Sequence, residues 1–211
     1  MKHKTTLIVR GGGDLASGVI HRLYKCGYQV LVMECAKPSA IRRRVSFGEA
    51  VYDGTSSVEG VTGRLIKDIS ECRKVWDKKE IPILVDEAAD AVSELKPDAL
   101  IDAILAKKNL GTTRAMAPLT IGLGPGFTAR MDVDYVVETQ RGHNLARVIE
   151  KGTAAPNTGI PGMIAGYGKE RVIHSPAAGM MHNYSEIGDI VEKDQIIAMV
   201  DETPEYASLT G

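Results

Sequence analysis

The chain has 211 residues, with 26 Lys and Arg against 27 Asp and Glu, and its net charge of −1 argues against a general nucleic-acid binder. Hydrophobic residues make up 44% and charged residues 25%, which is typical of a globular protein with one large or two modest domains. No apolar run approaches the ~20 residues that span a bilayer, and the N-terminal segment is too weakly apolar for a secretory signal. The odd number of cysteines (Cys26, Cys35 and Cys72) favours reduced thiols and a cytoplasmic protein.

Residues 5–34 have the pattern of one β-α-β unit. An apolar run ends at three glycines, a helical pattern follows, Gly27 closes it, and a second apolar run ends at Glu34. Gly11, Gly13 and Ala16 match the G-x-G-x-x-A pattern of dinucleotide-binding turns. We therefore expect the backbone N–H groups around Gly12, together with the helix N-terminus, to face a phosphate.

In this interpretation Gly13 lets a pyrophosphate approach the backbone, and Glu34 accepts hydrogen bonds from a ribose. An acidic side chain there favours NAD or an adenosine-type nucleotide over NADP. Asp14 is a good N-cap, but its charge lies near the incoming phosphate, and Arg10 can offset it. The alternative is a Rossmann-like fold that binds no nucleotide and keeps its glycines for chain geometry.

A basic segment, residues 37–54, follows the second strand. Arg42, Arg43 and Arg44 lie beyond the carboxyl end of that strand, where ligands bind in open α/β sheets. Because neighbouring residues point in different directions, one or two of these arginines can clamp a phosphate or carboxylate. The alternative is a charged, solvated turn.

Strands and helices alternate through the next hundred residues. Strands are expected at residues 61–66, 81–86, 99–102, 119–123 and 134–138, with helices at 70–80 and 86–97. This alternation predicts an α/β fold, with a Rossmann-like, mostly parallel sheet and helices on both faces. We expect this nucleotide-binding domain to comprise residues 1–142.

A second glycine-rich turn follows the strand at 119–123. Gly124 and Gly126 can place N–H groups around an anion, or can instead form a corner where the sheet bends. Arg141 and His143 flank a glycine after the next strand, so both side chains can point towards a ligand. His143 is the histidine best suited to acid–base work, although a hydrogen bond to phosphate suits an isolated histidine better.

Residues 143–211 are rich in Gly and Pro, with short apolar pieces, and predict a smaller β-rich module. The stretch RVIHSPAAGMMHNYSEIGDIVEKDQIIAMV (171–200) resembles half of a biotinyl or lipoyl-type barrel-sandwich hybrid. Gly179 and Gly188 are expected to form turns and Asp189 to hold one. Residues 201–204 lack the carrier lysine, which disfavours a swinging arm. We expect the module to be an incomplete barrel-sandwich and the chain to be truncated relative to its relatives.

Several blocks together resemble one known family, the YqeB-type accessory proteins of selenium-dependent molybdenum hydroxylase systems. These blocks are IVRGGGDLASG (8–18), AIRRRVSFGEAVYDG (40–54), LIDAILAKKNLG (100–111), PLTIGLGPGFTARMDVDYVVETQRGHNLARVI (118–149) and AAPNTGIPG (154–162). The family is distantly similar to the Rossmann domain of the xanthine dehydrogenase accessory factor. The resemblance implies a partner, a molybdenum hydroxylase or its maturation machinery, and a candidate ligand, a molybdenum-pterin dinucleotide.

Three functions are compatible with these patterns. The first is an accessory protein that binds a nucleotide or pterin dinucleotide, the second an NAD-dependent oxidoreductase with His143 as proton donor, and the third a docking scaffold without a ligand. No catalytic nucleophile can be assigned from order and spacing, and the histidines have no metal-binding spacing. A homo-oligomer is compatible with all three. The first two require free main-chain amides at the opening glycine turn.

Overall fold

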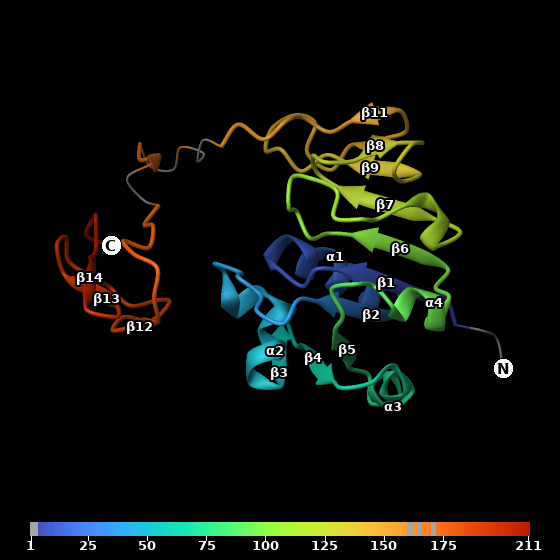
Figure 1. Ribbon diagram of the computed structural model, residues 1–211, viewed down its shortest axis with the longest axis horizontal. Helices are drawn as coiled ribbons and strands as arrows, with labels where there is room; N and C mark the ends of the chain where they lie inside the picture. Colours follow the sequence, from blue (N-terminus) through green and yellow to red (C-terminus); the bar gives the residue numbers. More distant parts are fainter. Residues whose placement is uncertain (1–3, 160–162, 164–165, 170–171) are drawn as a thin grey trace. The chain divides into compact units, whose positions relative to one another are not determined.

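The computed structural model describes residues 4–159, 163, 166–169 and 172–211. The chain forms two compact units, Met1–Asn157 and Thr158–Gly211, each described separately below. Figure 1 shows the large sheet of the first unit and the small sheet of the second. Residues 160–162 of the AAPNTGIPG motif and Arg171 of the barrel-like stretch lie outside the described residues.

The first unit is built on a nine-stranded sheet with the order β10-β9-β7-β6-β1-β2-β5-β4-β3. Every neighbouring pair is parallel except β3 with β4 and β9 with β10. The strands are β1 (Thr6–Arg10), β2 (Gln29–Glu34), β3 (Thr55–Val58), β4 (Val61–Ile66), β5 (Ile81–Val85), β6 (Ala99–Asp102), β7 (Thr120–Leu123), β9 (Tyr135–Val137) and β10 (Val148–Ile149). The expected mostly parallel α/β sheet is confirmed.

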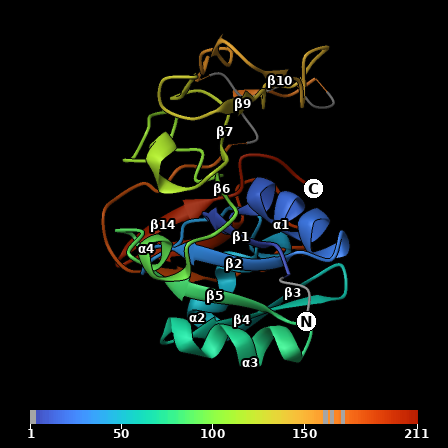
Figure 2. The same ribbon diagram turned by 90° about the vertical axis from the view of Figure 1, so that its right-hand side faces the viewer.

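Helices pack on both faces of this sheet, as Figure 2 shows for α1 and α4. The α-helices are α1 (Asp14–Lys25), α2 (Ala50–Asp53), α3 (Cys72–Asp77) and α4 (Ala91–Leu95), and the 3-10 helices are η1 (Arg43–Val45), η2 (Phe47–Glu49), η3 (Ile69–Glu71) and η4 (Arg114–Met116). Strand β1 is buried throughout because its alternate residues contact different cores: Val9 packs with Ile20 of α1, and Ile8 packs with Val75 of α3.

The helices predicted at 70–80 and 86–97 are shorter in the structure. Asp68 caps η3, which leads into α3, and Lys78 ends α3. Residues 86–90 form a turn before α4, in which the Asp86 carboxylate accepts hydrogen bonds from Asp90 N and Ala91 N. Local side-chain hydrogen bonds therefore replace the first helical turn expected there.

The first unit extends to Asn157 and so includes residues assigned by the sequence to the β module, whose expected start was residue 143. Strand β10 pairs with β9 at the edge of the large sheet. Strand β11 (Gly152–Thr153) pairs with β8 (Thr128–Ala129), which lies in the connection between β7 and β9. Both pairings tie residues 148–153 to the first unit.

The second unit contains a three-stranded antiparallel sheet of β12 (Met181–Asn183), β13 (Ile196–Val200) and β14 (Thr203–Tyr206). As expected, Asp189 holds a turn, because its Oδ2 accepts a hydrogen bond from Glu186 N at 2.8 Å. Gly188 beside it has a φ of +105°. These elements form a small antiparallel β sheet, and the barrel-sandwich arrangement remains a prediction.

Candidate functional site

The strand order places a switch point at the carboxyl ends of β1 and β6. Without the β3-β4 hairpin and β10, the strands lie in the order β5-β2-β1-β6-β7-β9. Along the chain, β2 and β5 are added on one side of β1, and β6, β7 and β9 are then added on its other side. In open α/β sheets, ligands bind outside the carboxyl ends of the strands where this reversal occurs. The opening glycine turn lies directly after β1, at this position.

Two of the three glycine amides of that turn form hydrogen bonds within the protein. Gly11 N donates to Met33 O at 2.7 Å, and Gly12 N donates to Glu34 Oε2 at 2.7 Å. Over the residues that the structure describes, the amides of Gly13 and Asp14 donate no hydrogen bond. The amides available to an anion are therefore those at the start of α1.

The turn is also closed on one side by the segment after β2. Gly48 N donates to Gly12 O at 2.8 Å, and a Cβ on Gly12 would lie 2.8 Å from Gly48 N. The Ser17 hydroxyl donates to Gly12 O and accepts from Phe47 N. These contacts explain why Gly12 has no room for a side chain, whereas the space around Gly13 is open.

Glu34 has a different neighbourhood from the one predicted. Its Oε2 accepts from Gly12 N, and its Oε1 accepts from Cys35 N at 2.8 Å. The carboxylate that was expected to contact a ribose thus binds the glycine turn itself. Ala16 lies where expected, fully buried in the core beneath α1.

Arg42 reaches the glycine turn, and Arg43 forms a different ion pair. Arg42 Nη1 contacts the Asp14 carboxylate at 2.5 Å, with about two-thirds of its side chain exposed. Arg42, rather than the Arg10 suggested by the sequence, therefore offsets the Asp14 charge. Arg43 lies 3.7 Å from Glu49.

The second glycine-rich turn packs against the loop that follows β6. Gly126 has a φ of +114°, and a Cβ there would lie 2.7 Å from Lys108 Cα. Gly124 has a φ of +75°, and a Cβ there would lie 2.6 Å from the Thr139 hydroxyl. Gly11 approaches another part of the same loop, with a hypothetical Cβ 2.9 Å from Ile104 Cα. Close backbone packing thus explains Gly126 and Gly11, whereas Gly124 is explained by its positive φ and by the Thr139 side chain beside it.

Arg141 and His143 lie in an exposed loop after β9, which begins beside a buried carboxylate, Glu138. Glu138 accepts hydrogen bonds at 2.8 Å from three backbone amides, those of Thr139, Gln140 and Ala155. Burial acts to raise the pKa of Glu138, but the three amides outweigh it and lower the pKa below its ordinary value. Glu138 therefore anchors this loop.

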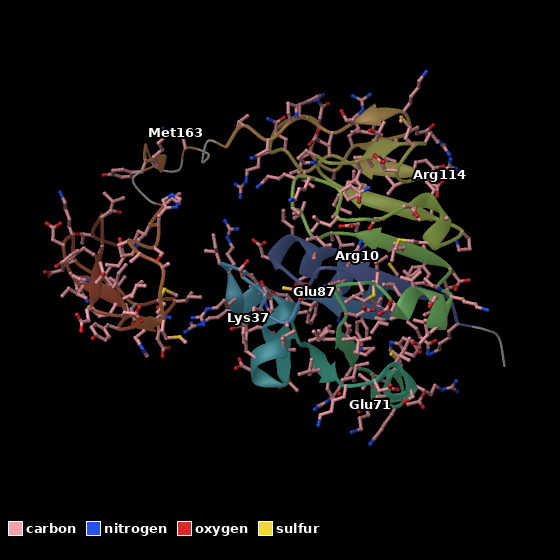
Figure 3. All side chains as sticks on the ribbon, viewed as in Figure 1. Arg10, Lys37, Glu71, Glu87, Arg114 and Met163 are labelled. Carbon is pink, nitrogen blue, oxygen red and sulfur yellow. The ribbon has the colours of Figure 1, made fainter. Side chains whose placement is uncertain are left out.

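A buried polar cluster at the switch point was not predicted. Thr112 Oγ1 accepts from Arg10 Nη1 and donates to Asp102 Oδ2, both at 2.6 Å, and the Arg10 and Asp102 charges are 3.6 Å apart. Arg10 Nη2 also donates to Glu87 O at 3.2 Å; Figure 3 labels both residues. The sequence did hold one indication of this cluster: Arg10 and Asp102 are the last residues of two buried strands, and parallel pairing of those strands places the two residues side by side.

The cysteines and the metal-binding residue types offer no further chemistry at this edge. Burial, and then the neighbouring Glu34 charge, raise the pKa of Cys35, which opposes a reactive thiolate. Across the described ranges, no group of three His, Cys, Asp or Glu side chains is placed to hold a metal ion.

The described helices include none with the length and apolar character needed to cross a membrane.

The fold and this edge define an α/β protein with Rossmann-like strand order and a partly closed glycine turn at its switch point. The chain is 49% identical over 205 residues to a protein of Escherichia coli (strain K12), "Uncharacterized protein YqeB". The match covers 97% of this chain and 38% of the relative, so the chain spans well under half of the relative's length. This similarity supports the predicted resemblance to YqeB-type proteins. No family model and no solved structure matches the chain.

Proposed function

We propose that the chain is a cytoplasmic accessory protein of a molybdenum hydroxylase system, and that it binds an anionic, nucleotide-type ligand at the carboxyl edge of its large sheet. The hydroxylase partner rests on the sequence resemblance. The ligand class rests on the geometry of the edge, and a molybdenum-pterin dinucleotide fits both. NAD is the alternative dinucleotide.

One observation carries the ligand proposal: the free amides of Gly13 and Asp14 lie at the N-terminus of α1, beside Arg42 and next to the switch point. The helix dipole and unpaired N–H groups attract anions at such an end, and an arginine adds a charged donor. Asp14 carries the opposing charge, and its ion pair with Arg42 reduces that repulsion.

The distribution of charge supports the same unit as the anion-binding part. Residues 1–157 contain 23 Lys and Arg against 19 Asp and Glu, whereas residues 158–211 contain 3 against 8. The overall charge of −1 therefore conceals a basic first unit and an acidic second one. A basic surplus raises the local concentration of an anionic ligand.

A matched pair of glycine variants tests the ligand site. Gly13→Val places a side chain in open space beside the free amides, at a φ of −65° that valine tolerates. Gly18→Val, also in open space but farther along α1, is the control. Thermal shift and calorimetry with NAD, ATP, CTP and molybdopterin species should show binding, and a ligand at a hundred times its Kd adds ~2.7 kcal/mol of stability. Gly13→Val should abolish this gain, and Gly18→Val should keep it.

The ligand-free docking scaffold is the second candidate, and the engaged amides of Gly11 and Gly12 favour it. If none of these compounds stabilises the protein, or if Gly13→Val binds as well as the unchanged chain, the ligand proposal fails and the scaffold is the better assignment. Stabilisation by NAD alone would instead favour an NAD-dependent protein.

A further inference from the structure

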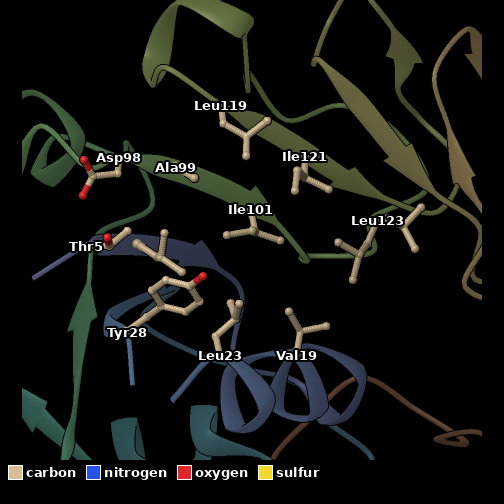
Figure 4. Close-up of a pocket in the computed structure, with 12 residues that line it drawn as sticks. Thr5, Val19, Leu23, Tyr28, Asp98, Ala99, Ile101, Leu119, Ile121 and Leu123 are labelled. Carbon is tan, nitrogen blue, oxygen red and sulfur yellow. The ribbon is translucent and has the colours of Figure 1, made fainter. Parts of the chain in front are cut away.

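The α1 side of the large sheet carries an apolar groove over β6, β7 and β9. Figure 4 shows its two walls, with Val19 and Leu23 of α1 facing the side chains of the sheet. The groove has a volume of about 390 Å³. The sheet wall consists of alternate, same-face aliphatic residues: Ile101, Leu119, Ile121, Leu123 and Val137.

The opposite face of the same strands is covered by the chain itself. Phe127 fills the space beside Gly122 of β7, and it packs with Val133 and Val136. Parallel strands are normally covered on both faces, in most cases by helices. In the described part of the chain, the connections from β6 to β9 contain no α-helix, only the 3-10 helix η4.

Val19 and Leu23 form the α1 wall of the groove, and Leu15 continues the same apolar ridge one turn beyond the lining residues. Leu15, Val19 and Leu23 are four residues apart and so follow one face of the helix. Leu15 is 53% exposed, and Val19 and Leu23 are partly buried. Rows of side chains with this spacing are those that pack into the grooves of a second helix, at an interaxial distance of about 8–10 Å.

The two ends of the groove differ in charge. Asp98, the residue after Pro97, lines the groove at the amino end of the strands. The loops at the carboxyl end carry the exposed cations Lys107, Lys108 and Arg141. This polarity complements the dipole of a helix whose N-terminus lies near Asp98 and whose C-terminus lies near the cations.

We propose that this groove is the docking site for an amphipathic α-helix of a protein partner, lying beside α1 with its apolar stripe on the sheet and its N-terminus towards Asp98. Gly13 and Asp14 of the anion site are not among the residues that line the groove, so either site can exist without the other.

The test uses the full chain and a fluorescently labelled synthetic peptide of about four helical turns, with leucines at i, i+3, i+4 and i+7. A peptide of the same composition in scrambled order is the control. Leu15→Glu and Val19→Glu place a charge on the ridge, and Leu110→Glu, at another partly exposed leucine, is the matched control variant. Circular dichroism establishes that each variant is folded, and light scattering measures the oligomeric state.

We expect the patterned peptide to bind and the scrambled one not to bind. Leu15→Glu and Val19→Glu should each weaken binding at least about tenfold, and Leu110→Glu should leave it unchanged. Equal affinity in the ridge variants, or equal binding of both peptides, would overturn the proposal. A dimer of the unchanged chain that Leu15→Glu converts to a monomer would also overturn it, because a second copy would then occupy the groove.

Discussion

The buried cluster of Arg10, Thr112 and Asp102 gives a sharp stability prediction. Thr112 is fully buried, and its hydroxyl makes one hydrogen bond to each charged partner, both at 2.6 Å. Thr112→Val keeps the shape of the side chain but removes both bonds. Hydrogen bonds to charged groups contribute about 1.5–3 kcal/mol each, and buried partners left unsatisfied add to the loss. In this variant Arg10 keeps its hydrogen bond to Glu87 O and its ion pair with Asp102. We therefore expect the free energy of unfolding to fall by about 2–4 kcal/mol.

Thr112→Ser is the control, because serine keeps the hydroxyl and loses only a methyl group, at a cost of about 1 kcal/mol. The assay is urea unfolding followed by the fluorescence of Trp76, the single tryptophan of the chain. Trp76 reports on the first unit, since its indole N–H donates to Val30 O at 2.9 Å. Valine and serine variants with free energies of unfolding within about 0.5 kcal/mol of each other would refute the argument.

Three further predictions concern two glycines, the buried carboxylate of Glu138, and the reactivity of Cys26 and Cys72. Gly111→Ala, at a φ of +97° in open space, should cost about 1–2 kcal/mol in the free energy of unfolding, and Gly126→Ala should cost at least about 1 kcal/mol more because its Cβ meets backbone. Since the folded pKa of Glu138 lies below its unfolded value of 4.5, its contribution is complete above that pH and is lost as the pH falls through the folded pKa. Glu138→Gln should therefore lower stability more at pH 7 than at pH 3 in urea titrations, and an equal loss at both would contradict this. Burial raises the pKa of Cys72 to about 12, so iodoacetamide should label the exposed Cys26 in the native protein and Cys72 only after unfolding, as mass spectrometry of the peptides will show.

The buried strands were predictable because burial on both faces makes a parallel strand continuously apolar, as in β1, β2 and β5. Strands β8, β10 and β11 have two residues each, which is too short for any pattern. Their pairing nevertheless decides where the first unit ends. Composition marked a change near residue 142, but β10 and β11 pair with β9 and β8, and the first unit extends to Asn157.

The candidate site was predictable in position but not in its contacts. Spacing placed the glycine turn, Glu34 and Arg42 at one edge, and the structure brings these together. The partner of each group depends on residues far along the chain, as for Arg10 and Thr112, which are 102 positions apart. A glycine needed for close packing and a glycine that leaves room for a phosphate look the same in the sequence. The role of Gly124 and Gly126 was therefore ambiguous until the structure showed their neighbours.

Glu34 is the group that distinguishes the possible ligands of this edge. An ionised carboxylate has about four acceptor positions, and the amides of Gly12 and Cys35 take two of them. A ligand hydroxyl can therefore still donate to Glu34, whereas a phosphate cannot accept from Gly12 while that amide is engaged. An anionic ligand must consequently place its charge one residue farther on, at the amides of Gly13 and Asp14 beside Arg42. A ligand that combines a phosphate with a hydroxyl donor would satisfy both conditions, and this supports our proposal of a nucleotide rather than a simple anion at this edge.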